Sequence, residues 1–189
     1  MQQTDLEIQK AKESLFLFKK ILDKHDVNFI LDGGTLLGAH RDKDFCKGDH
    51  TDIDLTTLVD PSVALDILED AGEKGFTLYH YWRGRKKATD QFSVKKDGIK
   101  IDLMFKSIKG RKAWWTIFKG KDELIYKAVP AKYYLQTKEI KFLGENFRIP
   151  KDTPGYLKYR YGNWKVPIHA RDYSCYKSDK CIKESYEKI

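Results

Sequence analysis

LDGGTLLGAHRDKDFCKGDHTDIDL, residues 31–55, is the most informative segment of the 189-residue chain. Gly33 and Gly34 precede an apolar run that predicts a short helix over residues 35–41, and glycine allows a backbone to approach a phosphate closely. Asp52 and Asp54 follow on an expected strand, where side chains at i and i+2 point to the same face. A phosphate-binding turn followed by paired carboxylates is the minimal arrangement for phosphoryl or nucleotidyl transfer.

A third acidic residue strengthens this interpretation. Asp102 lies in IKIDLMF, residues 99–105, an otherwise apolar segment in which a buried carboxylate needs a partner. It could complete a metal site with the two preceding carboxylates, since hard cations such as Mg²⁺ and Mn²⁺ prefer oxygen ligands, or it could act as a general base. Two alternatives stay open: a salt bridge from Asp102 to Lys100 or Arg83, and a solvated strand edge for the paired carboxylates.

Basic side chains are candidates for contacts with an anionic substrate. Arg41 ends the helix that follows the glycines, and Arg83 and Arg85 belong to a basic cluster at residues 83–87. Arginine suits bidentate contacts with phosphate. His50 stands just before the paired carboxylates and could contact substrate or a cation. A solvated loop explains the basic cluster equally well, and a loop histidine more often has neither role.

Composition indicates the kind of partner without defining it. Lys and Arg total 36 against 28 Asp and Glu, which gives a net charge of +8 and favours anionic partners. No aromatic RNA-binding signature appears, so only the net charge supports nucleic acid as a partner. We therefore do not expect nucleic acid to be the partner. No apolar run is long enough for a membrane span, the N-terminus lacks the layout of a signal peptide, and the three cysteines match no zinc spacing. We therefore expect a cytoplasmic protein with reduced thiols.

The order of expected elements predicts an α/β (α+β) fold with a small mixed sheet flanked by helices. Residues 1–171 are expected to form one catalytic domain, followed by a polar tail at 172–189. A capping box of Thr4 and Glu7 predicts that the first helix begins at Thr4. The other expected elements are strands over 27–32, 52–59, 76–82 and 114–118, a helix opened by Asp60 and Pro61, hairpins over 92–105 and 138–149 turning near 96–98 and 144–146, and a helix over 152–161 ended by Gly162.

Four segments together resemble the LicD family, whose members include fukutin and fukutin-related protein. They occur in the family's order and are 31–41 (LDGGTLLGAHR), 52–55 (DIDL), 100–105 (KIDLMF) and 156–167 (YLKYRYGNWKVP). The resemblance implies a nucleotidyltransferase (polymerase β-like) fold. It also implies transfer of a phospho-alcohol or phospho-sugar from a nucleotide-activated donor to a glycan hydroxyl, as with phosphocholine from CDP-choline. The chain departs from the family at 48–51, where GDHT replaces the frequent Pro-Trp-Asp and is nearer to the fukutin variant.

By the same resemblance, residue roles carry over to matching positions. Metal binding falls on Asp52 and Asp54, with Asp102 as the third carboxylate, and donor-phosphate contacts fall on Gly33, Gly34 and Thr35.

The sequence therefore predicts a Mg²⁺- or Mn²⁺-dependent phosphotransferase with a donor that we expect to be CDP-linked. In this interpretation the metal neutralises the leaving nucleotide, while Asp102 accepts the proton of a glycan or sugar hydroxyl. One alternative is an NTP-dependent nucleotidyltransferase that acts on a small molecule or protein. The other is a non-catalytic basic binding protein, against which the three acidic positions argue because binding alone does not require them.

Overall fold

A five-stranded mixed sheet forms the centre of the protein. The computed structural model describes residues 3–83, 89–119 and 123–167. The strand order is β1-β2-β5-β4-β3, with β2 and β5 parallel and the other neighbours antiparallel. The expected α/β fold with a small mixed sheet is thus confirmed. The strands are β1 (Phe29–Leu31), β2 (Asp52–Thr57), β3 (Thr77–Arg83), β4 (Thr89–Lys96) and β5 (Ile99–Phe105).

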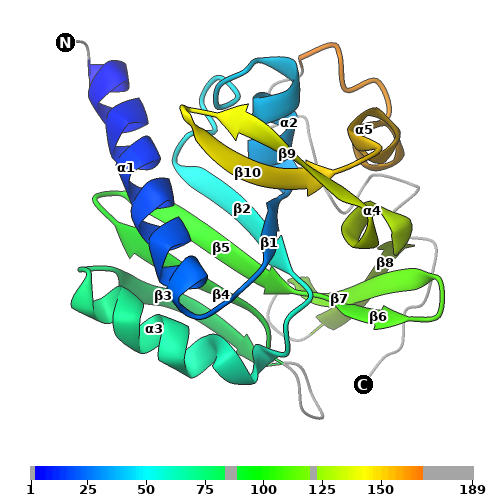
Figure 1. Cartoon of the computed structure of the whole chain (residues 1–189), viewed down its shortest axis with the longest axis horizontal. Helices are drawn as coiled ribbons and strands as arrows, with labels where there is room; N and C mark the ends of the chain where they lie inside the picture. The colour runs from blue at the N-terminus through cyan, green and yellow to red at the C-terminus, as the bar shows by residue number, and fades with distance from the viewer. Residues whose placement is uncertain (1–2, 84–88, 120–122, 168–189) are drawn as a thin grey trace.

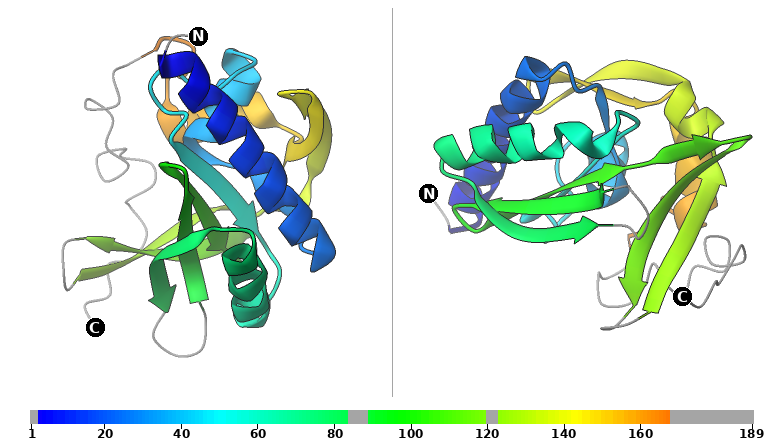
Figure 2. Two further views of the ribbon diagram at one scale, coloured as in Figure 1. Left: turned by 90° about the vertical axis from the view of Figure 1, so that its left-hand side faces the viewer. Right: turned by 90° about the horizontal axis from the view of Figure 1, so that it is seen from below.

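Two helices cover one face of this sheet. The long helix α1 (Gln3–Lys24) and the shorter α3 (Ala64–Glu73), which follows a 3-10 turn at Pro61–Val63, lie together on that face (Figures 1 and 2). Leu15, Phe18 and Leu22 recur at helical spacing in α1 and are fully buried in the core. Because burial of apolar surface is the main favourable term in folding, this stripe fixes α1 against the sheet.

The start of α1 differs from the expected capping box. The helix already includes Gln3, so Thr4 lies inside its first turn and does not cap it. Glu7 instead pairs with His50, at 3.1 Å. The prediction failed because the capping signature is local, whereas the Glu7 partner lies more than forty residues away along the chain.

Both expected hairpins are present. β4 and β5 join at Asp97 and Gly98, which both have positive φ as a two-residue hairpin turn requires. The other hairpin pairs β9 (Thr137–Phe142) with β10 (Glu145–Pro150). Its turn is at Leu143 and Gly144, slightly earlier than expected.

A second, three-stranded sheet extends beyond the end of β5 (Figure 1). It consists of β6 (Ser107–Lys109), β7 (Lys112–Lys119) and β8 (Glu123–Pro130), and the short helix α4 (Lys132–Leu135) follows. Only β7 was expected from the sequence. The last described helix, α5 (Thr153–Tyr161), begins after Asp152, which accepts a hydrogen bond from Gly155 N–H, and ends at Gly162, as predicted.

None of the helices in the described ranges is long and apolar enough to cross a membrane. The expected polar tail at 172–189 lies outside the described residues, and the domain boundary at 171 stays a prediction.

Two helical glycines provide a matched test of the packing. A Cβ at Gly38, in helix α2 (Gly33–Arg41), would lie 2.5 Å from the Asp44 carbonyl oxygen and 2.6 Å from Cys46 N, whereas a Cβ at Gly72 in α3 would meet nothing within 4 Å. We expect Gly38→Ala to lower the free energy of unfolding by about 1–3 kcal/mol, the usual range for overpacking. Gly72→Ala should raise it by up to about 1 kcal/mol, because alanine favours a helix. Urea denaturation of both variants measures this; equal effects would contradict the packing around α2.

Candidate functional site

The pairing of β2 with β5 brings three carboxylates together. In the parallel register Asp54 lies opposite Asp102, and Asp52 lies opposite Lys100. Asp52, Asp54 and Asp102 each offer an oxygen, and these oxygens all lie within 4.8 Å of one another. The three residues singled out from the sequence therefore form one cluster with the donor set that a hard divalent cation prefers.

The electrostatics of this cluster are those of a site whose negative charge is only partly offset. Burial raises the pKa of Asp54 to about 8, and the neighbouring carboxylates of Asp52 and Asp102 add to the effect. Burial also raises the pKa of Asp102, against the opposing influence of Lys100 and a hydrogen bond from Ser93. Among the described residues, no hydrogen-bond partner satisfies the buried Asp102 Oδ1. An unpartnered oxygen inside a carboxylate cluster fits a metal ligand.

Lys100 supplies a cation inside the cluster. Its Nζ lies 2.9 Å from Asp52 Oδ1 and 3.3 Å from Asp102 Oδ2. The salt bridge to Lys100 that the sequence left open as an alternative for Asp102 is therefore present together with the carboxylate cluster. Attraction to both carboxylates raises the pKa of Lys100 above its usual value, although burial alone would lower it.

The glycines lie in the first turn of helix α2 (Gly33–Arg41), which begins two residues earlier than expected. Gly33 has a φ of +53°, and a Cβ there would lie 1.8 Å from Asp54 Oδ2. Gly34 N–H donates to Asp54 Oδ2 at 3.1 Å, and Asp54 N–H donates to Thr35 Oγ1 at 2.9 Å. The two glycines thus allow the helix start to contact the carboxylates, and their predicted contact with phosphate stays a prediction.

Asp49 is a fourth acidic residue at this site that the sequence reasoning missed. A Cβ on Gly34 would lie 1.9 Å from Asp49 Oδ2, so this carboxylate stands directly over the helix start. Burial raises the pKa of Asp49 to about 6, and the charge of Asp52 adds to the shift. The segment 42–50 is mostly polar and loop-like, and nothing in the sequence indicated which of its carboxylates turns inward.

Asp32, the N-cap of α2, is the centre of a buried hydrogen-bond network that was also missed. Its carboxylate is fully buried and accepts a hydrogen bond from Gly33 N–H at 2.8 Å. The other donors come from β2, the end of β5, α4 and α5: Thr56 Oγ1 at 2.7 Å, Lys106 Nζ at 2.6 Å, Tyr134 OH at 3.4 Å, Tyr156 OH at 2.5 Å and Arg160 Nη1 at 3.1 Å. One side chain thus connects five elements around the helix start.

Charges balance within this network. Burial alone would raise the pKa of Asp32, but the cations of Lys106 and Arg160 hold it well below its usual range. Burial lowers the pKa of Lys106 to about 8, even though Asp32 favours its charged form. The Lys106 ammonium also lies 4.2 Å from the centre of the Trp115 ring, a favourable cation–π contact. The sequence did contain one signal of this network, because Lys106 is a lysine that directly follows an apolar strand.

The four basic residues that the sequence singled out as substrate contacts either pair with acidic residues of the protein or lie partly or wholly outside the described residues. Arg41 binds Asp42 at 2.7 Å and donates to the Trp164 carbonyl oxygen at 3.2 Å, which ties α2 to the segment after α5. His50 is buried and paired with Glu7. Arg83 ends β3, but its side chain and the whole of Arg85 lie outside the described residues. The predicted substrate contacts of all four stay predictions.

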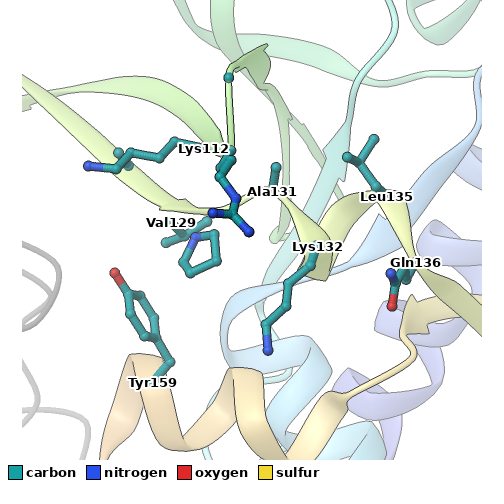
Figure 3. Close-up of a pocket in the computed structure, with 11 residues that line it drawn as sticks. Lys112, Val129, Ala131, Lys132, Leu135, Gln136 and Tyr159 are labelled. Carbon is teal, nitrogen blue, oxygen red and sulfur yellow. The ribbon is translucent and has the colours of Figure 1, made fainter.

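A cavity of about 590 Å³ lies between the second sheet and helices α4 and α5. Figure 3 shows Lys112, Lys132 and Tyr159 around it. Arg111 adds a third cation to its lining. None of the carboxylate cluster lines this cavity, so it is separate from the candidate site.

Solved structures with a similar fold are nucleotidyltransferases. The solution structure of the antibiotic-resistance factor ANT(2'')-Ia matches with a TM-score of 0.53 and 13% identity, over 92% of this chain and 80% of that one. The crystal structure of ANT(2'')-Ia in complex with adenylyl-2''-tobramycin matches with a TM-score of 0.52 and 12% identity, over 90% and 87% of the two chains. The protein therefore has a nucleotidyltransferase fold.

Sequence comparison identifies the family to which the chain belongs. Residues 26–152 match the LicD/FKTN/FKRP nucleotidyltransferase domain, and the chain belongs to this family. The ribitol-5-phosphate transferases FKTN of Macaca fascicularis and Homo sapiens are each 27% identical to it over 166 residues, which is 87% of this chain. The match spans 35% of the length of these relatives.

The carboxylate cluster predicts how stability depends on pH. The pKa of Asp54 rises from 3.8 to about 8 on folding, so between these values the folded state holds a proton that the unfolded state has lost. The contribution of Asp54 to stability without metal then falls as pH rises from 5 to 8. We expect Asp54→Asn to lose less stability over this interval, by up to about 4 kcal/mol, since the amide does not titrate. Urea denaturation in EDTA measures both proteins, and parallel pH curves would contradict the assignment.

Proposed function

We propose that this chain transfers a phospho-alcohol or phospho-sugar from a nucleotide-activated, CDP-linked donor to a glycan hydroxyl. The observation that carries the proposal is the cluster of Asp52, Asp54 and Asp102 beside the glycine-rich start of α2. Membership of the LicD family and the similarity to ribitol-5-phosphate transferases support a polyol phosphate as the transferred group.

The residues of the cluster fit a divalent cation. All three ligand groups are carboxylates, and the buried Asp102 Oδ1 has no hydrogen-bond partner among the described residues. Asp52, Asp54 and Asp102 would hold Mg²⁺ or Mn²⁺, which when bound would neutralise negative charge on the donor phosphates. The cation would also offset the repulsion from Asp52 and Asp102, which adds to the effect of burial on the pKa of Asp54.

The chain's own groups have distinct roles in this proposal. Asp102 accepts the proton of the acceptor hydroxyl, a role that suits a carboxylate with a raised pKa. The start of α2 faces the cluster and favours an anionic group through the positive end of its dipole. Gly34 brings backbone close to this position, and Thr35 orients Asp54 through the hydrogen bond to its N–H. These groups would position the donor phosphate next to the attacking hydroxyl.

A donor panel tests the proposal. With Mg²⁺ present, CDP-ribitol, CDP-glycerol or CDP-choline should raise the melting temperature more than any NTP does, because the pocket must accept the group beyond the pyrophosphate. CMP should form when a hydroxyl-bearing glycan acceptor is added. Asp52→Asn should abolish the metal-dependent stabilisation. Asp42→Asn is the matched control: it removes a carboxylate that pairs with Arg41 outside the cluster, and it should keep that stabilisation.

Two results would contradict the proposal and favour one of the alternative functions. Stabilisation by NTPs alone, with release of pyrophosphate, would identify an NTP-dependent nucleotidyltransferase. Tight RNA binding that Asp52→Asn does not affect, with no response to any nucleotide, would identify a basic binding protein.

A further inference from the structure

We propose that Lys100 is an internal counter-ion of the carboxylate cluster, which a divalent cation must displace in order to bind. This inference rests on the metal site of the proposed function and concerns a residue outside its ligand set. Lys100 Nζ bridges Asp52 Oδ1 at 2.9 Å and Asp102 Oδ2 at 3.3 Å, so it joins two of the three carboxylates.

The position of Lys100 follows from the sheet. It is the parallel partner of Asp52 and stands two residues before Asp102 on β5, so its side chain shares their face. Three carboxylates within 4.8 Å repel one another, and one ammonium offsets part of this repulsion. The folded chain can therefore hold the cluster together before any metal arrives.

The same position makes Lys100 a competitor. A metal bound by all three aspartates would lie next to the Lys100 ammonium, which now occupies one oxygen each of Asp52 and Asp102. Two cations at adjacent positions repel each other, so the ammonium must move away. Lysine suits this movement because its charge sits on a flexible four-carbon chain, and the Lys100 side chain is 24% exposed, which leaves it a route to solvent.

The other groups around Lys100 do not provide a second anchor. Its antiparallel neighbour on β4 is Lys95, another cation. Lys95 Nζ lies 3.5 Å from the centre of the Tyr79 ring. Asp49 is close enough for Lys100 to lower its pKa, but no ion pair joins them among the described residues.

Removal of Lys100 should therefore have two effects of opposite sign. Lys100→Met should lower the melting temperature of the metal-free protein, because the carboxylates lose their counter-ion. It should also tighten Mn²⁺ binding by about tenfold, because nothing has to be displaced. Lys95→Met removes the same charge from the same sheet without touching the cluster, and its Mn²⁺ affinity should stay within about twofold of the parent.

The full chain is titrated with Mn²⁺ alone, without nucleotide, and free Mn²⁺ is measured by electron paramagnetic resonance at one fixed pH. Lys100→Gln, which keeps a neutral hydrogen-bond donor, replaces Lys100→Met if that variant does not fold, and should tighten binding at least threefold. Unchanged or weaker Mn²⁺ binding by the Lys100 variants would overturn the inference and leave the proposed function standing. Absence of Mn²⁺ binding by the parent and every variant would overturn both.

Discussion

Repulsion between carboxylates that the backbone forces together is the constraint on which the rest of this site depends. The parallel pairing of β2 with β5 places Asp54 opposite Asp102 and Asp52 beside them, so the backbone keeps the three side chains on one small area of the sheet. Three local features offset the resulting charge: the Lys100 ammonium, the Gly34 N–H that donates to Asp54, and a raised pKa that favours the protonated form of Asp54. A fold that gains nothing from these carboxylates would hold them apart, which is the physical reason to regard the cluster as functional.

The buried Asp32 carboxylate holds the other half of the site in place. It caps α2, and its partners on β2, α4 and α5 and at the end of β5 fix that helix relative to the sheet. Such a network is strong only if every member is satisfied, and loss of one charged partner leaves the others buried without compensation. Two of the carboxylates beside the glycines therefore differ: the cations of Lys106 and Arg160 balance the charge of Asp32, whereas no ion pair joins Asp54 to a cation among the described residues.

The sequence predicted the elements whose signals are local. Asp97 and Gly98 in a hairpin turn and Gly162 at a helix end act through their own backbone, and both expectations were confirmed. Asp60 and Pro61 were expected to open a helix; Asp60 caps a 3-10 turn at Pro61–Val63, and α3 follows from Ala64. Alternation of polar and apolar residues likewise placed the acidic side chains of β2 on one face. These signals were sufficient for the fold class and for the residues of the carboxylate cluster.

The features that the sequence did not predict depend on contacts between distant segments. Asp32 and Arg160 lie 128 positions apart, and no local pattern indicates that they meet. Asp49 was missed because it turns inward from a polar loop. Lys100 was considered only as part of a salt bridge in place of a metal site, whereas it contacts two of the candidate metal ligands. The glycines were assigned to phosphate binding, but the structure adds a second requirement, since a side chain at Gly33 would overlap the Asp54 carboxylate.

The proposed function requires that Asp52, Asp54 and Asp102 jointly bind a divalent cation. The most direct measurement is the anomalous scattering of a crystal of this chain soaked in Mn²⁺ and CDP-ribitol. We expect a manganese peak within coordination distance of all three carboxylates, with Lys100 moved away from Asp52 and Asp102. A peak elsewhere, with Lys100 still bridging these two carboxylates, would contradict it.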